Sequence, residues 1–340
     1  MCKLKDSIQV GTLTLSNRLV MPPMASGKLS KDDTVTDTTC TYYGQRAKGG
    51  HIGLIIAEHA YISPEGKAHK GQLSISRDSD VDSLAKLVSV IHKDGTKAFA
   101  QISHAGAAAD SQVTGYPVLG PSAVSDSAGD PVFKNMNLKT KAMDSGDIKK
   151  VIRDFVSAAL RAKAAGFDGV EIHSAHRYLL NQFYSPLTNK RTDEYTGNTL
   201  EGRLRLHFEI IQAIREAVGK DYPLAIRLGA CDYMDGGTTL EDSIRAAKYL
   251  EAVGIDLLDI SGGLCGTARP GHSEPGYFSE LSQGIKENVS IPVMVTGGVR
   301  TPEDAKKLLA DGKADLIGVG RALLKDPDWA ALAENRDFKL

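Results

Sequence analysis

The stretch that decides the fold is Ala165-Gly166-Phe167-Asp168-Gly169-Val170-Glu171-Ile172-His173, where a short Gly-containing turn leads into a run of mostly apolar residues. It follows Asp147–Lys163, whose apolar residues recur with helical spacing. A helix, a tight turn and a buried strand in this order form one α–β unit. The strand runs out at His173, and His176 and Tyr178 follow directly. We therefore expect two imidazoles and a phenol at a strand end, which is where α/β proteins bind ligands.

Units of this kind recur along the whole chain. Strand-length runs of Val, Ile, Leu and Ala alternate with amphipathic segments, which is typical of parallel strands covered by helices. We expect eight strands, at Leu19–Pro22, Leu54–Ala57, Lys97–Ser103, Gly169–His173, Leu224–Leu228, Leu257–Ser261, Pro292–Thr296 and Leu316–Val319. Eight such alternations in 340 residues predict an α/β fold of the (β/α)8 TIM-barrel type. A doubly wound sheet would need a Gly-x-Gly-x-x-Gly turn after an early strand, and the chain has none.

Two further segments modify the predicted barrel. Ile8–Asn17 has the pattern of an N-terminal hairpin that closes the bottom of the barrel. The segment 104–143, after the third strand, is long, polar and Gly-rich. Loops of that length in a compact domain are usually functional, so we expect a capping insertion over the top face. Because neither a linker nor a low-complexity segment is visible, the sequence predicts a single domain over 1–340.

Composition excludes several classes of function. A formal net charge of -1 argues against nucleic acid as the main partner. No apolar run approaches the ~20 residues of a membrane helix, and the N-terminus lacks the apolar core of a signal peptide. A cytoplasmic location and no membrane partner are the resulting expectations. The four cysteines are far apart and form no Cys-x-x-Cys pair, which argues against an iron–sulfur or zinc-ribbon site.

The last two strand ends carry Gly297-Gly298 and Gly320-Arg321. Glycines let backbone N–H groups approach an anion closely, helices are expected after both turns, and Arg321 adds a bidentate partner. Barrels of this type often bind phosphate with these two loops. We therefore predict a phosphate site here; the alternative is that the glycines only make tight turns.

Gln101 and Arg227 lie within apolar strands. A primary amide both donates and accepts, which suits the edge of a heteroaromatic ring where a carbonyl lies beside an N–H. A buried guanidinium needs a partner. For Arg227 this is either a core carboxylate, Asp232 or Asp259, or a ligand that becomes anionic.

His173 and His176 lie three residues apart, a spacing that would point them to opposite faces of a strand. Both reach one site only if the strand ends near His173 and the chain then bends. A zinc site would need a third ligand at a suitable spacing, and none is present, so no metal is expected. Two imidazoles with Tyr178 in the next turn indicate a catalytic site.

These residues resemble the Old Yellow Enzyme family of FMN-dependent ene-reductases, in particular its short single-barrel bacterial branch. The resemblance covers nearly the whole barrel. It rests on His173-x-x-His176-x-Tyr178-Leu179-Leu180-Asn181-Gln182-Phe183-x-Ser185-Pro186, Asn189-Lys190-Arg191-Thr192-Asp193-Glu194-Tyr195, Ser16-Asn17-Arg18-Leu19-Val20-Met21-Pro22-Pro23-Met24, Ser63-Pro64-Glu65-Gly66, Gln101-x-x-His104-Ala105-Gly106, Gly120-Pro121-Ser122-Ala123 and Gly320-Arg321.

The resemblance implies an NAD(P)H-dependent oxidoreductase that reduces the C=C bond of an alkene activated by a carbonyl or carboxyl group. FMN would take hydride from NADPH or NADH and pass it from N5 to the β-carbon, in ping-pong fashion. His173 and His176 would hold the substrate carbonyl, and Tyr178 would protonate the α-carbon. The cofactor-binding residues would be Pro22, Pro23, Met24, Ala25, His59, Gln101, His173, Arg227, Ser261, Gly262, Gly263, Gly297, Gly298, Gly320 and Arg321. A homodimer or a homotetramer would fit relatives of this kind.

The chain departs from the family pattern in four places. The tyrosine that this branch places shortly after the first strand is absent, and the local run there is Ser26-Gly27-Lys28-Leu29. The other three departures are single site residues. Ala25 stands where relatives carry Thr or Cys, and His59 stands where they keep a small residue beside the flavin. Arg177 replaces the usual Gly; its side chain either faces solvent or the cap, or binds an acidic substrate together with His173, His176 and Tyr178. Other functions remain open: a different reductive or demethylating reaction on the same fold, or a flavin-binding protein without catalysis. A metal-assisted or Schiff-base barrel enzyme lacks the necessary residues at the strand ends.

Overall fold

A computed structural model describes residues 3–25, 30–124 and 129–335, so the run 26–29 lies outside the described residues. Eight parallel strands form a closed barrel, each hydrogen-bonded to the next in chain order, and the last pairs with the first. They are β3 (Leu19–Met21), β6 (Leu54–Tyr61), β7 (Lys97–Ser103), β10 (Gly169–Ser174), β11 (Leu224–Gly229), β12 (Leu257–Ser261), β13 (Val293–Thr296) and β14 (Leu316–Gly318). The predicted (β/α)8 TIM barrel is confirmed, and each expected strand overlaps one of these.

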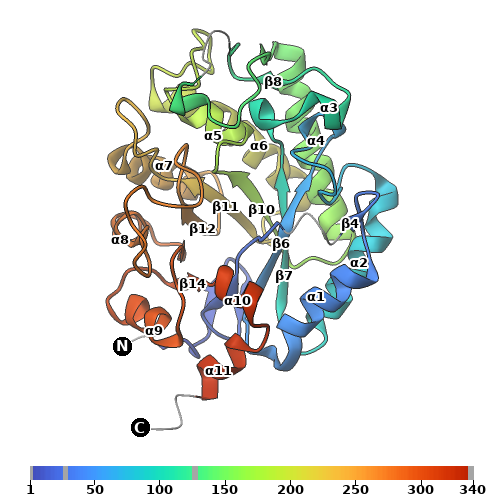
Figure 1. Cartoon of the computed structure of the whole chain (residues 1–340), viewed down its shortest axis with the longest axis vertical. Helices are drawn as coiled ribbons and strands as arrows, with labels where there is room; N and C mark the ends of the chain where they lie inside the picture. Colours follow the sequence, from blue (N-terminus) through green and yellow to red (C-terminus); the bar gives the residue numbers. More distant parts are fainter. Residues whose placement is uncertain (1–2, 26–29, 125–128, 336–340) are drawn as a thin grey trace.

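Helices follow the strands and cover the outside of the barrel (Figure 1). They are α1 (Asp37–Ala47), α2 (Val81–His92), α4 (Ser145–Ala164), α5 (Leu179–Tyr184), α6 (Leu200–Val218), α7 (Leu240–Ala252), α8 (Ser279–Lys286), α9 (Pro302–Ala310), α10 (Arg321–Lys325) and α11 (Trp329–Asn335). Side chains of Asp144, Thr239 and Thr301 cap α4, α7 and α9 in reciprocal capping boxes. The helix starts are therefore encoded locally. No described helix is long and apolar enough to span a membrane.

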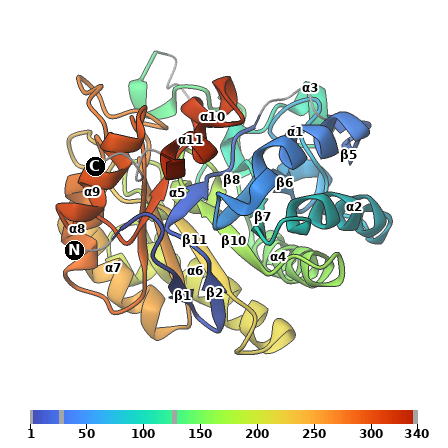
Figure 2. The ribbon, with the colours of Figure 1, turned by 90° about the horizontal axis from the view of Figure 1, so that it is seen from below.

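The N-terminal hairpin consists of β1 (Ile8–Val10) and β2 (Leu13–Leu15), paired antiparallel. Val10 and Leu15 are fully buried and pack with residues that fill the inside of the barrel, among them Phe99. Seen from below, β1 and β2 lie at this end of the barrel (Figure 2). The hairpin thus closes the bottom as predicted, and a ligand must enter from the opposite end.

Strand β6 is longer than predicted and irregular. Its pairing with β7 shifts register between Ala57 and Ala60, so one extra residue is accommodated in a β-bulge. In this stretch the backbone N–H of Glu58 donates a hydrogen bond to the side-chain hydroxyl of Tyr43, in α1, at 2.8 Å. His59 lines the cavity at the top of the barrel. The strand continues to Tyr61 instead of ending at Ala57 as expected, because the residues of the bulge do not follow the apolar pattern of a regular strand.

The insertion 104–143 lies at the same end of the barrel as the cavity. It holds short elements, α3 (Ser111–Thr114) and the pair β8 (Leu119–Gly120) and β9 (Lys141–Ala142), around two single-turn 3-10 helices. Its apolar residues pack on Leu264, in the loop after β12, and on Leu187, beyond α5. None of its described residues lines the cavity. Its described residues therefore lie beside the cavity at the top face of the barrel and do not form part of the cavity wall.

Candidate active site

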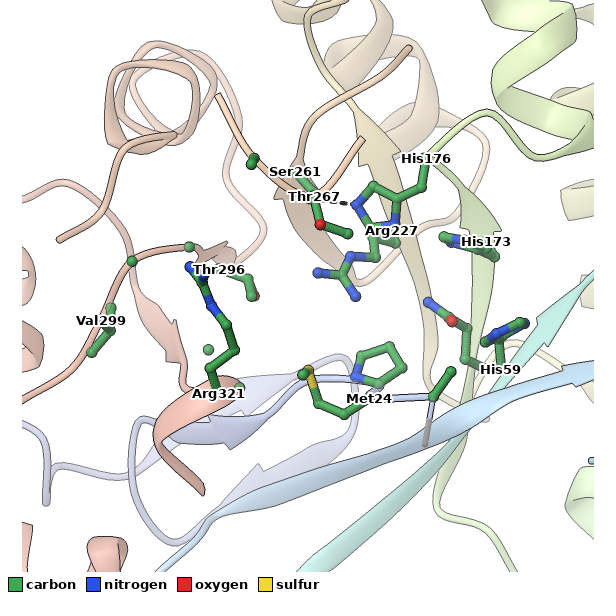
Figure 3. A pocket seen from close by; sticks show the side chains of 18 of the residues that line it. Met24, His59, His173, His176, Arg227, Ser261, Thr267, Thr296, Val299 and Arg321 are labelled. Carbon is green, nitrogen blue, oxygen red and sulfur yellow. Dashed lines mark hydrogen bonds between the residues drawn. The ribbon is translucent and has the colours of Figure 1, made fainter. Parts of the chain in front are cut away.

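A cavity of about 390 Å³ opens at the carboxyl ends of the barrel strands. Its volume falls in the range of cofactor and ligand pockets, roughly 300–1,000 Å³. Figure 3 shows Arg321 and Val299 at one end, His59 and His173 at the other, and Arg227 between them. Residues predicted from the sequence make up most of the lining: Pro23, Met24, Ala25, His59, Gln101, His173, His176, Tyr178, Arg227, Ser261, Gly297, Gly298, Gly320 and Arg321.

The imidazoles and the phenol meet as the sequence spacing required. β10 ends at Ser174, and the chain then bends, with left-handed φ values of 57° at His176 and 71° at Arg177. The ring centroid of His173 consequently lies 5.3 Å from that of His176 and 4.9 Å from that of Tyr178. Burial, together with the neighbouring histidine and the positive charge of Arg227, lowers the pKa of His173 well below its usual value. The pKa of His176 is lowered for similar reasons, so both imidazoles are neutral at pH 7.

His176 is fixed by the end of the neighbouring strand. Its Nε2 lies 2.7 Å from Oγ of Ser261, the last residue of β12. Its backbone N–H donates to the carbonyl of Gly262 at 3.4 Å. Nδ1 of His173, by contrast, is buried and has no hydrogen-bond partner in the described part of the chain.

Tyr178 and His59 complete this end of the cavity, with ring centroids 5.4 Å apart. Burial raises the pKa of Tyr178 to about 12, so the phenol keeps its proton at neutral pH. Burial lowers the pKa of His59 to about 3, with smaller effects from His69 and Arg227. The Nδ1 atom of His59 lies 2.7 Å from Nε2 of Gln72. The departure at position 59 thus places a neutral imidazole in the cavity wall.

A polar layer lies across the barrel at the base of the cavity. Nε2 of Gln101 donates to Oε1 of Glu171 at 2.8 Å. Nε of Arg227 lies 3.1 Å from Oδ2 of Asp259, an ion pair whose alignment is too poor for a hydrogen bond. Burial raises the pKa of Asp259 to about 6 and that of Glu171 well above its usual value. Asp259 is therefore the protein partner of Arg227.

Asp232, the other carboxylate considered for Arg227, is engaged elsewhere. Its side chain accepts hydrogen bonds from the backbone N–H groups of Thr238 and Leu264 and from Oγ of Ser185. It organises the loops that follow β11 and β12.

The far end of the cavity is a glycine cradle. Gly298 has a φ of 71°, and a Cβ atom there would lie 2.3 Å from the carbonyl oxygen of Glu274. A Cβ atom on Gly297 would lie 2.6 Å from the ring of Tyr277. Arg321, at the start of α10, lies beside this cradle, with Nη2 3.5 Å from the hydroxyl of Tyr277. A guanidinium next to side-chain-free backbone suits a phosphate group. Gln101 and Arg227 would suit the polar edge of a flavin ring, so the residues present fit FMN.

Four predicted site residues do not line the cavity. They are Pro22, Arg177, Gly262 and Gly263. Gly262 and Gly263 stabilise the cavity wall through their backbone groups. The carbonyl of Gly262 accepts a hydrogen bond from the N–H of His176, and the N–H of Gly263 donates to the carbonyl of Cys231.

The guanidinium of Arg177 points to the insertion. Its Nη1 donates to the backbone carbonyls of Pro131 at 3.1 Å and Val132 at 2.7 Å. Of the two roles considered for Arg177, the geometry therefore favours the cap-facing one over a substrate clamp.

Six lining residues were not predicted: Thr267, Ala268, Tyr277, Thr296, Val299 and Gly318. Thr296, Val299 and Gly318 adjoin the glycine loops, and counting outward from those loops would have found them. Thr267, Ala268 and Tyr277 lie in the long connection between β12 and α8. The hydroxyl of Tyr277 donates to the carbonyl of Thr267 at 2.7 Å, which shapes this connection. The length of this connection is the one feature of the sequence that could have indicated these three residues.

The closed barrel, the glycine cradle and the imidazole–phenol cluster define a (β/α)8-barrel flavin oxidoreductase. The chain matches the NADH:flavin oxidoreductase / NADH oxidase family over residues 3–337 and belongs to that family. The cofactor of the family is FMN, and NAD(P)H is its hydride donor. The suspected Old Yellow Enzyme relationship is confirmed.

Individual relatives are similar in sequence and in structure. The chain is 40% identical to the NADH oxidase of Thermoanaerobacter brockii over 332 residues, which are 96% of this chain and 50% of the relative. It superposes on an old yellow enzyme homologue from Zymomonas mobilis with a TM-score of 0.84 and 30% identity, covering 99% and 94% of the two chains. It superposes on 2-naphthoyl-CoA reductase, solved with 2-naphthoyl-CoA, with a TM-score of 0.89 and 29% identity, covering 98% and 52%. The chain spans about half the length of the curated relatives it matches.

Proposed function

We propose that this chain is an FMN-dependent oxidoreductase that takes hydride from NAD(P)H and reduces the C=C bond of an alkene activated by a carbonyl or carboxyl group. The observation that carries the proposal is the convergence of His173, His176 and Tyr178 at one end of a cavity whose other end combines the glycine cradle with Arg321. When bound, FMN supplies a two-electron redox centre that accepts and releases hydride.

The two imidazoles suit the binding of a carbonyl oxygen. Because burial lowers the pKa of both His173 and His176, each is neutral near pH 7 and offers one N–H. Neutral donors polarise a carbonyl without transferring a proton to it. The β-carbon of a conjugated alkene becomes electron-poor when its carbonyl is held in this way, and the substrate class follows from that chemistry.

Tyr178 suits the role of proton donor. Tyr178 lines the cavity with its ring beside that of His173, and burial raises the pKa of its hydroxyl to about 12. A phenol that stays protonated at neutral pH can deliver a proton to a carbon that has gained electron density. The proton is held at the phenolic oxygen until the substrate is reduced at the neighbouring carbon.

Gln101 and Arg227 would hold the polar edge of the cofactor ring, and Gly297, Gly298 and Arg321 its phosphate. Since one amide hydrogen of Gln101 bonds to Glu171, its amide oxygen is left to accept from a ring N–H. Arg227 supplies a fixed positive charge at the base of the cavity. Both substrates would use the one cavity, which implies ping-pong kinetics.

Anaerobic half-reactions test the proposal. The holoprotein is reduced with NADPH or NADH while flavin absorbance is followed, and is then mixed with an enone, an enoate or a nitro compound. We expect bleaching, then recovery of absorbance with the enone or the enoate only. The oxidised holoprotein is mixed separately with an N-methylated amine, which should leave its absorbance unchanged. Tyr178→Phe should slow recovery by the enone by a factor of about 10² or more and spare reduction.

Four results would contradict the proposal. A protein that binds no flavin, or one that binds flavin but is not bleached by either nucleotide, refutes it outright. Recovery with the nitro compound alone would replace alkene reduction by a different reductive reaction, and bleaching of the oxidised protein by the amine would replace it by a demethylating one.

A further inference from the structure

The contact between His176 and Ser261 determines more than the position of the ring. Ser261 is 1% exposed, and its Oγ lies 2.7 Å from Nε2 of His176. No other hydrogen bond of this hydroxyl occurs in the part of the chain that the structure describes. A neutral imidazole carries one proton, and the nitrogen that carries it is set by the bond made by the other.

Two arrangements of the proton are compatible with a 2.7 Å contact. If Nε2–H donated to Ser261, the buried hydroxyl would keep its own hydrogen without an acceptor among the described residues. A buried polar hydrogen without a partner costs about 1–3 kcal/mol. If Ser261 instead donates to Nε2, every hydrogen of the pair is used, and the imidazole proton lies on Nδ1.

The neighbouring histidine has the opposite arrangement. Nδ1 of His173 is buried without a partner among the described residues. An unpaired buried N–H is rarer and more costly than an unpaired acceptor. The proton of His173 therefore lies on Nε2, which is not enclosed in the same way and belongs to a side chain that lines the cavity.

We propose that Ser261 is a positioning residue that holds His176 in the tautomer with its proton on Nδ1, so that the cavity presents two neutral donors, Nδ1–H of His176 and Nε2–H of His173. The inference deepens the proposed function, because two N–H donors are what a substrate carbonyl oxygen requires. The tautomer itself does not depend on the identity of the substrate.

The direct test is the tautomeric state of His176 in the holoprotein labelled with [15N]histidine. Long-range ¹H–¹⁵N spectra at pH 7.5 distinguish a protonated from an unprotonated ring nitrogen, and His176→Gln assigns the signals. We expect a protonated Nδ1 and an unprotonated Nε2 in the unaltered protein. In Ser261→Ala we expect the proton to move wholly or partly to Nε2, and in Ser261→Thr, which keeps the hydroxyl, to return to Nδ1.

The chain offers a matched control. Oγ of Ser174 lies 2.8 Å from Nε2 of His207, which is the same type of buried pair outside the cavity. Ser174→Ala should alter the spectrum of His207 and leave that of His176 unchanged. A protonated Nε2 on His176 in the unaltered protein would overturn the inference, and so would a His176 signal that is the same in Ser261→Ala.

Kinetics supply a second readout. Losing one donor to the substrate oxygen should raise KM for the enone about tenfold in Ser261→Ala, the equivalent of one hydrogen bond. Ser261→Thr should restore it. An unchanged KM despite a moved proton would refute the role toward the substrate. If the unaltered protein is not reoxidised by any alkene, the proposed function fails, whereas the NMR result stands or falls separately.

Discussion

Arg227 and Asp259 face each other across the neighbouring strands β11 and β12, with Nε of the guanidinium 3.1 Å from Oδ2 of the carboxylate. Both side chains are buried at the base of the cavity. The carboxylate compensates the guanidinium, and Arg227 also lines the cavity, where its charge would act on a bound cofactor ring. The pair therefore links the stability of the barrel to the electronic properties of the site.

Asp259→Asn should uncouple these two effects. A buried charge left without its partner destabilises a protein by about 3–5 kcal/mol, and the uncompensated Arg227 should raise the midpoint potential of bound FMN. Urea unfolding and redox titration at pH 7.5 measure the two quantities. Asp242→Asn, which breaks the more exposed pair with Arg203, is the control and should leave the potential unchanged. An unchanged or lower potential in Asp259→Asn would contradict the expectation.

Ala25 lies in the cavity wall where the family resemblance places Thr or Cys beside the flavin C4=O. Introducing a donor in Ala25→Cys or Ala25→Thr should stabilise the reduced cofactor. A hydrogen bond of about 1.4 kcal/mol corresponds to a rise of about 30 mV for a two-electron couple. Redox titration measures this shift. A potential equal to that of the unaltered protein would show that position 25 does not contact the ring.

Arg177 should not discriminate between acidic and neutral alkenes, since its guanidinium is bound to the carbonyls of Pro131 and Val132. Arg177→Gly is expected to change KM for an enoate and for an enone by the same factor. Because φ is 71° at this position, Arg177→Gly should also be more stable than Arg177→Ala, by about 1 kcal/mol. Steady-state kinetics and urea unfolding test the two statements. A selective rise of KM for the enoate would restore the substrate-clamp role.

The glycine cradle can be tested against a glycine with the same backbone strain. Gly298 and Gly312 have φ values of 71° and 69°, but a Cβ atom would strike the Glu274 carbonyl at the first position and meet nothing at the second. Gly312→Ala should therefore cost only about 1 kcal/mol of backbone strain, and Gly298→Ala about 1–3 kcal/mol more. Gly298→Ala should also release FMN on dialysis while Gly312→Ala retains it. Equal retention would argue against phosphate binding at this loop.

The buried histidines predict that stability falls in mild acid. Burial lowers the pKa of His207 from 6.5 to about 3, so between pH 6.5 and 3 the unfolded chain binds the proton and the folded chain does not. Each such group removes about 2 kcal/mol between pH 6.5 and 5. Asp259, with its pKa raised to about 6, opposes this below pH 6, because there the folded state takes up the proton first.

His207→Gln isolates one of these contributions, because His207 lies outside the cavity. Urea unfolding at pH 7.5 and pH 5 should show a loss of stability that is about 2 kcal/mol smaller in the variant than in the unaltered protein. If both proteins lose the same amount, His207 takes up its proton in the folded state and the expectation is wrong.

Much of the fold was predictable because its elements are encoded locally. Parallel strands covered on both sides are almost continuously apolar, so the interior of β11 or β12 stands out in the sequence. Polar residues that interrupt or end such runs, such as Gln101, His173 and Arg227, are conspicuous for the same reason. Caps such as Thr301 mark the helix starts. For these residues the local sequence and the tertiary structure agree.

The remainder depends on contacts between distant segments. Tyr277 forms part of the cavity wall because its ring occupies the space left by Gly297 and Gly298. The sequence around Tyr277 gives no indication of this contact. The direction of the long Arg177 side chain is set by carbonyl groups 45 residues earlier in the chain. Which carboxylate pairs with Arg227 depends on the register of β11 and β12 and on the conformation of the loops that engage Asp232.

The irregularity of β6 has a consequence for how this site could change. Alternate residues of a strand face opposite sides, and the extra residue between Ala57 and Ala60 fixes which of Glu58 and His59 faces the interior. Deleting the codon of His59 would remove the extra residue together with the neutral imidazole that it places in the cavity wall. The polarity of this wall therefore depends on a one-residue insertion in β6.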